Sequence, residues 1–110
     1  MDKTAVEASQ KAVEEFTRKI TGLYATRLNK VVLYGSWARG DATEDSDIDL
    51  LVVFAGQVVP GLEIDRMIDI VTDINLEYNV LLAVYPVSEH DYATLNSPLL
   101  LNIRREGIPA

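Results

Sequence analysis

The sequence predicts a single α/β (α+β) domain over residues 1–110, in which a small mixed sheet of about three or four strands is covered by helices. Three observations lead to this fold class. The chain has 110 residues, the size of one small domain. Its apolar content of 48% and charged content of 25% are those of a globular protein. Stretches with helical spacing of apolar residues alternate with short apolar runs typical of strands.

The first helix is predicted from Thr4 to about Leu28. Thr4 is expected to cap its start, with Glu7 three residues later as the capping-box partner. Asn29 is the expected stop. Apolar residues recur at spacings of three and four, which predicts one buried face; its members are Val6, Val13, Phe16, Ile20, Leu23 and Tyr24.

Two strands and a helical turn are predicted next. Residues 31–34 form a short apolar run closed by a glycine, and residues 36–39 have the length of one helical turn. The polar stretch 41–46 predicts a loop. Residues 48–54 are almost continuously apolar, so this strand is expected to be central and covered on both faces.

The C-terminal half predicts two further helices and a third strand. The helix covers residues 62–79, with a buried face formed by Ile64, Met67, Ile68, Val71, Ile74 and Tyr78. The third strand covers residues 80–85 and ends at Pro86. A short helix is expected to start at Ser88–Glu89, and a last helix runs from the N-cap Ser97 to a stop at Gly107.

Composition excludes several classes of site. The absence of cysteine excludes disulfides, a thiol nucleophile and a thiolate zinc site. His90 is the single histidine, so a multi-histidine metal site is excluded, and a surface position after the third strand is favoured for it over a role as base. No basic segment followed by an apolar one opens the chain, and no apolar run is long enough to cross a bilayer, so a cytoplasmic location is expected.

Charge is unevenly distributed. The net charge of −7 disfavours binding of nucleic acid through a broad basic face. Seven of the ten basic residues fall between Lys3 and Arg39, whereas residues 41–91 hold twelve acidic residues and one basic residue, Arg66. This half is either a solvated acidic face or a patch for cations or a basic protein partner.

A homodimer is a further expectation, because a chain with so small a core gains stability by sharing apolar surface with a second copy.

The most informative stretch begins with Gly35-Ser36 and ends, after ten residues, with Asp47-Ile48-Asp49. Glycine permits a sharp turn after the first strand and a close approach of a ligand to the backbone. Ser36 supplies a hydroxyl and an N–H group at the start of a helical turn, a combination that suits phosphate. These features predict a phosphate-binding turn, while an ordinary turn is the structural alternative.

Asp47 and Asp49 are two residues apart, so on a strand their side chains leave the same face with Cα atoms about 6.6 Å apart. Two carboxylates 4 Å apart at an effective dielectric of 20 would repel each other by about 4 kcal/mol. A bound cation would relieve this repulsion. Oxygen ligands alone, without histidine or cysteine, favour Mg²⁺ or Mn²⁺. Alternatively, Asp47 caps the end of the loop.

The segments Leu33–Gly40 and Ser46–Leu50 together resemble the signature of the minimal nucleotidyltransferases, a family of the DNA polymerase β-like superfamily. Chain length, element order and the closing segment Asn102–Gly107 are also similar to that family. The resemblance implies the polymerase β-like fold, with Gly35 and Ser36 holding a nucleoside triphosphate. It also implies that Asp47 and Asp49 bind Mg²⁺ and serve as the catalytic residues.

The resemblance further implies transfer of AMP from ATP to a hydroxyl of a protein acceptor. Several members of the family act as antitoxins beside a HEPN-domain ribonuclease toxin, so such a toxin is an expected partner. The alternative is a docking antitoxin that binds nucleotide, with weak or no catalysis, and neutralises its partner by complex formation. Transfer to RNA or to a small molecule is a weaker hypothesis, because the negative net charge opposes RNA binding and no second domain to hold a small molecule is expected in these 110 residues.

One departure from the superfamily concerns a third carboxylate that often completes the metal site from the later strand. Residues 80–85 contain no acidic residue. Either two carboxylates suffice with water and substrate phosphates, or one of the flanking residues Glu77, Glu89 and Asp91 reaches the site, or the protein binds nucleotide and turns it over poorly.

Arg39 and Trp37 lie within the signature, and each has two interpretations. Arg39 either contacts a phosphate or forms a salt bridge to Asp41 or Glu44 that stabilises the loop. Trp37 either stacks on an adenine or packs against the first helix, and packing is favoured.

Overall fold

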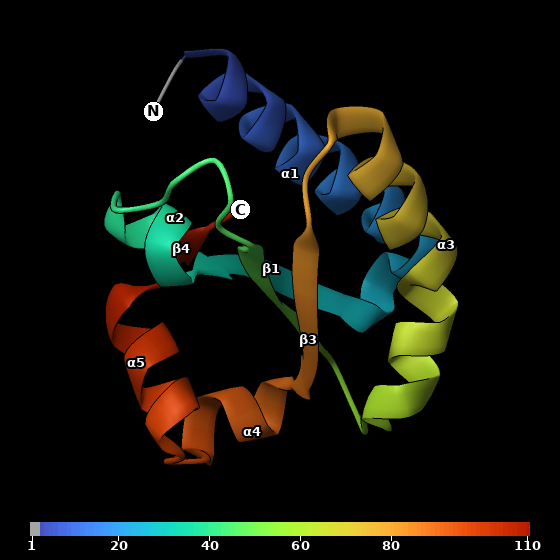
Figure 1. Ribbon diagram of the computed structural model, residues 1–110. Helices are drawn as coiled ribbons and strands as arrows, with labels where there is room; N and C mark the ends of the chain where they lie inside the picture. Colours follow the sequence, from blue (N-terminus) through green and yellow to red (C-terminus); the bar gives the residue numbers. More distant parts are fainter. Residues whose placement is uncertain (1–2) are drawn as a thin grey trace.

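The computed structural model describes residues 3–110 and shows a four-stranded mixed sheet flanked by helices (Figure 1). The predicted α/β class is thereby confirmed. The elements, in chain order, are α1 (Lys3–Tyr24), the 3-10 turn η1 (Ala25–Arg27), β1 (Leu28–Tyr34), α2 (Gly35–Arg39), β2 (Ile48–Phe54), α3 (Pro60–Tyr78), β3 (Leu82–Ser88), α4 (Glu89–Thr94), α5 (Pro98–Glu106) and β4 (Ile108–Pro109).

The strand order is β3-β2-β1-β4. β1 is antiparallel to both β2 and β4, and β2 is parallel to β3 through the crossover helix α3. Every residue of β2 except Asp49 is buried, as expected for a central strand covered on both faces. Its bounds, 48–54, are those predicted from the apolar run.

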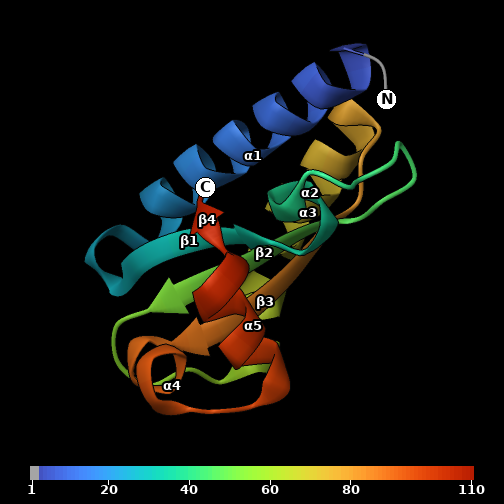
Figure 2. The same ribbon diagram turned by 90° about the vertical axis from the view of Figure 1, so that its left-hand side faces the viewer.

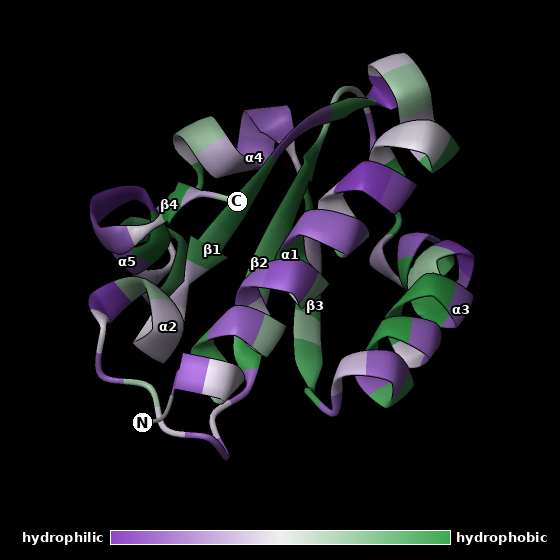
Figure 3. Cartoon of the chain, turned by 90° about the horizontal axis from the view of Figure 1, so that it is seen from above, coloured by the Kyte–Doolittle hydropathy of each residue, from purple (hydrophilic) through white to green (hydrophobic). Residues whose placement is uncertain are grey.

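Helices cover the two faces of the sheet, α1 and α3 on one face and α5 and α4 on the other (Figure 2). Alternate strand residues divide between two cores because side chains of a strand point to opposite faces. On one face Ile48, Leu50 and Val52 meet Phe16 and Ile20 of α1. On the other face, Val32, Leu51, Val53 and Val87 pack with Leu100 and Ile103 of α5. Figure 3 shows the apolar strands β1 and β2 beneath the polar outer face of α1.

Several predicted details of the helices are wrong. α1 includes Thr4 within the helix, so Thr4 is not its N-cap, and the helix ends at Tyr24. The buried stripe of α1 repeats every four residues through Ala12, Phe16, Ile20 and Tyr24, which leaves Leu23 beside the stripe and 48% exposed. In α3 the expected core residues Ile64 and Ile68 are also exposed; Met67 and Ile74 are buried as predicted.

The predicted end of the third strand at Pro86 is also wrong, because β3 continues to Ser88. β3 lies at the edge of the sheet, where proline can point its ring nitrogen away from the ladder. β4 follows Gly107, whose position admits no side chain: a Cβ there would lie 2.5 Å from Val32 Cγ1 and 2.6 Å from Ile103 O. The predicted caps Ser88 and Ser97 accept hydrogen bonds from Asp91 N and Leu100 N.

Candidate active site

The turn between β1 and α2 brings the chain from the sheet directly into a short helix. Tyr34 has extended backbone, and Gly35, with φ +74°, opens α2. α2 is one short stretch of five residues, and Gly40 ends it at φ +83°. The N–H groups of Gly40 and Asp41 both donate to Ser36 O, at 3.0 and 3.1 Å. The Gly35-Ser36 pair therefore forms the sharp turn after β1 that the sequence predicts.

Gly35 lies against Asp49 of the neighbouring strand. The register pairs Tyr34 with Asp49, so the residue after Tyr34 passes beside the Asp49 side chain. A Cβ on Gly35 would overlap Asp49 Oδ2 and lie 3.1 Å from its Cγ. Only glycine allows this approach, for reasons of both space and backbone conformation. The carboxylate is thus held next to the backbone of the proposed phosphate turn.

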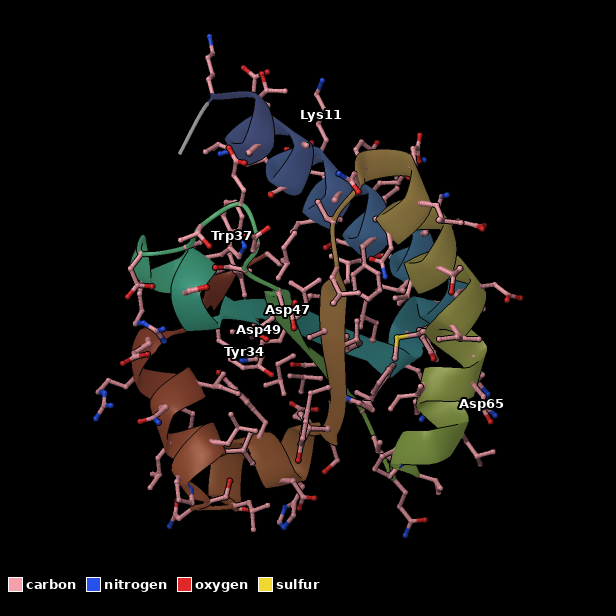
Figure 4. All side chains as sticks on the ribbon, in the orientation of Figure 1. Lys11, Tyr34, Trp37, Asp47, Asp49 and Asp65 are labelled. Carbon is pink, nitrogen blue, oxygen red and sulfur yellow. The ribbon has the colours of Figure 1, made fainter. Side chains whose placement is uncertain are left out.

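Asp47 and Asp49 lie close together where β2 begins, beside Tyr34 (Figure 4). Asp47 is exposed, while Asp49 is half-buried. Burial raises the pKa of Asp49, the negative charge of Asp47 raises it further, and the Arg39 guanidinium lowers it. The arrangement is an electrostatically strained pair of carboxylates that a divalent cation would relieve.

Tyr34 shares the environment of Asp49. Burial raises the pKa of the Tyr34 hydroxyl, and the charges of Asp49 and of Tyr85 on β3 raise it further. The phenol therefore stays neutral beside the carboxylate at physiological pH. Tyr34 is a site residue that the sequence analysis did not single out.

The loop between α2 and β2 is closed by its own hydrogen bonds. Ser46 N donates to Thr43 O at 3.0 Å, and Thr43 N donates to Ser46 Oγ at 2.9 Å. The indole N–H of Trp37 donates to Ser46 O at 3.3 Å, and the Trp37 ring packs against the α1 side of the core. Trp37 thus has the structural role favoured above, and it anchors the loop that leads into Asp47.

A pocket of about 350 Å³ connects these elements. Its lining includes Gly35, Ser36, Arg39 and Asp49, so the structure brings together four of the five predicted site residues. Asp47 lies outside the lining, as an exposed residue directly before β2. The rest of the wall consists of Tyr34 and residues of α5: Leu99, Asn102, Ile103 and Glu106.

Helix α5 was not expected in the site. In the sequence, the only indication of this helix as part of the site is that Asn102–Gly107 is similar to the family. That similarity does not imply a function for any single residue of the segment. In the structure Arg105 donates from Nη2 to Asn102 Oδ1 at 2.8 Å, which leaves the amide nitrogen of Asn102 facing away from that bond. The C-terminal helix therefore supplies polar groups opposite the Gly35-Ser36 turn.

Arg39 bridges two carboxylates at the rim of the pocket. Its Nε lies 3.3 Å from Asp41 Oδ2, and its Nη1 lies 3.6 Å from Glu106 Oε2. The salt bridge to Asp41 is the one considered above, and Glu106 adds a second from α5. Because Arg39 lines the pocket and about half of its side chain is exposed, it can also reach a phosphate bound there.

No acidic residue stands beside Asp49 on β3, because its neighbour in the register is Ala83. The registers place Tyr34, Asp49 and Ala83 side by side across β1, β2 and β3. Glu77 instead contacts Glu15 of α1 on the other side of the sheet, and Glu89 follows the far end of β3. In residues 3–110 no three histidine or acidic side chains converge on a position that could hold a metal ion.

Within the same residues, no helix combines the length and the apolar character needed to cross a membrane. His90 is exposed on α4, at the far end of β3 from Asp49, so it has no part in this site. The surface position expected for it is confirmed.

Comparison with known proteins identifies the family of this chain. The model of the nucleotidyltransferase domain family matches residues 11–92. A protein of Methanocaldococcus jannaschii named "Putative protein adenylyltransferase MJ0604" is 37% identical over 99 residues, which are 89% of this chain and 93% of that protein. A second protein of that organism with the same kind of name, "Putative protein adenylyltransferase MJ0141", is 35% identical over 64% of this chain and 71% of its own length.

Two solved structures share the fold. A structure described as that of "a putative nucleotidyltransferase from Sulfolobus solfataricus" has a TM-score of 0.55 at 23% identity, and the match covers 99% of this chain and 87% of that chain. A structure described as a toxin-antitoxin with AMP-PNP has a TM-score of 0.61 at 16% identity, and the match covers 87% of this chain and 70% of that chain. With the family model spanning most of the chain, we conclude that it belongs to the nucleotidyltransferase domain family of the polymerase β-like superfamily.

Proposed function

We propose that this nucleotidyltransferase moves AMP from ATP to a hydroxyl of a protein acceptor and thereby acts as the antitoxin of a HEPN-domain ribonuclease. The observation that carries the proposal is the close approach of Gly35 to Asp49, which joins a phosphate-type turn to a carboxylate pair. Support comes from the relatives named as protein adenylyltransferases and from the fold shared with a toxin-antitoxin structure that contains AMP-PNP.

The triphosphate is assigned to the pocket lined by Gly35, Ser36 and Arg39. The glycine backbone and the serine hydroxyl contact phosphate oxygens without a side chain in the way. Arg39 would then exchange one of its two carboxylate partners for a phosphate, which its five N–H donors allow. Tyr34 and α5 form the walls that enclose the remainder of the nucleotide.

Mg²⁺ is assigned to Asp47 and Asp49, whose oxygens suit a hard cation and whose mutual repulsion it would remove. When bound, the ion neutralises phosphate charge and lowers the pKa of a coordinated hydroxyl. The chain's own part is to hold Asp49 against Gly35 and so to align the carboxylates with the phosphate turn.

In the reaction an acceptor oxygen attacks the α-phosphorus of ATP. The new bond between the α-phosphorus and the acceptor oxygen forms as the bond from the α-phosphorus to the oxygen that bridges it to the β-phosphate breaks. Pyrophosphate leaves, and the acceptor hydroxyl releases its proton to water. Catalysis by this chain consists mainly of positioning and charge neutralisation, because no third carboxylate lies in the row of Asp49 to take the proton.

A docking antitoxin with weak or no catalysis is the second candidate. One observation favours it: Ala83 stands beside Asp49 where an acidic residue would complete the site. In that function the chain would bind nucleotide and neutralise its partner by forming a complex, and the two aspartates would be dispensable.

The experiment that separates the two candidates uses ATP labelled at the α-phosphate, Mg²⁺ and a HEPN-domain ribonuclease toxin as the acceptor. We expect label on the toxin, and we expect it to be lost with Asp47→Asn/Asp49→Asn while binding of the toxin survives. Neutralisation of the toxin by the double variant, with no label transferred by the wild-type chain, would establish the docking function instead.

A further inference from the structure

The outer edge of β3 is open. β3 pairs with β2, and no strand of the described chain lies on its other side. Ile48 N donates to Leu81 O, so the backbone groups of residues 81, 83 and 85 point toward β2 and those of 82, 84 and 86 point outward. The edge therefore presents main-chain groups that another strand can bind.

β3 continues to Ser88, so its edge has four outward positions, at residues 82, 84, 86 and 88, and the first and third are already blocked as donors. Leu82 N donates to Asn75 Oδ1 at 3.0 Å, and Pro86 has no N–H group. Val84, which lies between them, has both an outward N–H and an outward C=O. An antiparallel strand uses such a residue fully, because two directly opposed residues exchange both bonds.

The register relates this edge to the site. Tyr34, Asp49 and Ala83 form one row across the sheet, with their side chains on the α5 face. A strand added outside β3 would extend this row by one residue, whose Cα would lie two strand spacings, or about 10 Å, from that of Asp49. The methyl group of Ala83 leaves the space between them open. A long hydroxyl side chain such as tyrosine spans most of that gap, whereas serine does not.

The other face of such a strand would meet exposed apolar side chains of α3. α3 and β3 run in opposite directions (Figure 1), and Asn75 marks the side of the helix that faces β3. Ile68 lies two turns earlier on that side, and Ile64 one turn before it. Ile68 is 48% exposed and Ile64 is 42% exposed, so an exposed apolar surface flanks the middle of the open edge of β3.

Charge indicates the kind of segment that fits. Next to the isoleucines the exposed surface of α3 carries Asp65 and Asp69, and Figure 4 shows Asp65 pointing away from the helix. The whole chain has a net charge of −7. A segment with lysine or arginine beside its apolar residues is complementary to this surface.

We propose that an extended, basic segment of the acceptor protein adds to β3 as an antiparallel edge strand and so presents a hydroxyl side chain to Asp49 across Ala83. The proposal rests on the proposed function. It assigns the docking surface of the acceptor to the Val84 edge and the Ile64/Ile68 flank of α3.

The probe is the synthetic peptide Lys-Thr-Thr-Val-Tyr-Val-Thr-Thr-Lys, added to the full chain with Mg²⁺ and α-labelled ATP. Its valines would face α3, and its tyrosine would face the site. We expect label on the tyrosine and slower hydrogen exchange at the Val84 amide. N-methylation of both valines removes the N–H groups that face β3 and should lower labelling and affinity at least about tenfold. N-methylation of the tyrosine and of the threonine two residues later affects the outer edge and should change neither.

A matched pair of variants tests the α3 flank. Ile68→Asn should weaken peptide binding about tenfold, and Leu76→Asn, on the solvent side of the same helix, should not. Equal labelling of the two N-methylated peptides, or a Val84 amide unaffected by the peptide, would overturn edge docking while leaving the transferase in place. Protection of Val84 without any label would instead retain the docking surface and count against transfer.

Discussion

Gly35 and Asp49 approach each other so closely that no side chain fits on Gly35, since a methyl group there would overlap Asp49 Oδ2. This contact joins the end of β1 to the start of β2, and it holds one carboxylate of the pair against the turn assigned to phosphate. The position of the site thus follows from the antiparallel register of two neighbouring strands.

Gly35→Ala should therefore abolish nucleotide transfer. The substitution adds a clash with Asp49 to the cost of a left-handed backbone, which is about 1–2 kcal/mol for a residue with a side chain. Gly56→Ala is the matched control, because Gly56 has φ +79° and open space around its Cα. Thermal unfolding should show a loss of stability in both variants, whereas calorimetry with ATP and Mg²⁺ should show lost binding in Gly35→Ala alone. Normal binding by Gly35→Ala would mean that the Asp49 position is not critical.

Asp49→Asn should stabilise the metal-free protein while abolishing activity. Burial and the charge of Asp47 raise the pKa of Asp49 above its ordinary value of 3.8, so its ionised form is disfavoured in the folded state. This penalty is present above the raised folded pKa and disappears as the pH falls below the unfolded value. The Tm of Asp49→Asn should exceed that of the wild type by a few degrees at pH 7, since about 1 kcal/mol corresponds to roughly 4–8 °C for a domain of this size.

The difference in Tm should shrink as the pH is lowered toward 3.8, because Asp49 of the wild type then becomes neutral. Mg²⁺ should raise the Tm of the wild type and have less effect on the variant, since binding requires the ionised carboxylate. If Asp49→Asn is less stable than the wild type at pH 7, then burial and the charge of Asp47 do not destabilise the ionised Asp49 carboxylate as argued.

Arg39→Gln should raise the KM for ATP about tenfold, as expected for loss of one charged hydrogen bond to phosphate. Arg39 contacts Asp41 and Glu106, so a purely structural role would lower the Tm and leave the KM unchanged. Arg105→Gln is the control, because Arg105 also pairs with Glu106 but is 71% exposed and lies outside the pocket lining. Steady-state kinetics and thermal unfolding of the two variants distinguish these roles.

Arg27→Ala should destabilise the fold by about 2 kcal/mol, more than Arg66→Ala does. Both arginines pair with Glu63, which is 1% exposed, at 2.9 and 2.7 Å. Arg27 is the more buried of the two and also lies over the Phe54 ring, 5.2 Å from its centroid. Urea unfolding of the two variants measures the difference, and a larger loss for Arg66→Ala would show that Arg27 contributes little.

This ion pair explains one failure of prediction from sequence. Helical spacing in α3 favoured Ile64 for the core, but the structure buries Glu63 and exposes Ile64. The pattern could not show that Arg27, from another element, neutralises Glu63. In contrast, the run 48–54 predicted β2 with the correct bounds, because a strand buried on both faces has an unambiguous composition.

In the candidate site, too, the features set by local sequence were predicted and those set by packing of distant elements were not. Gly35, Ser36 and Asp49 were predicted from a local pattern, and they meet because adjacent elements form them. The wall supplied by Asn102 and Glu106 was missed, since its position depends on how α5 docks on the far face of the sheet. β4 was too short to leave a periodic signal, being two residues long.

Ala83→Asp should place a third carboxylate beside Asp49, in the same row of the sheet. Without metal the added charge should lower the Tm, because three acidic groups then repel one another. With Mg²⁺ the Tm should recover, and transfer to the acceptor should increase about tenfold if proton removal limits the rate. Ala83→Asn is the control, since it has the same shape and no charge. Unchanged activity in Ala83→Asp, despite tighter Mg²⁺ binding, would show that two carboxylates suffice and that positioning of the acceptor limits transfer.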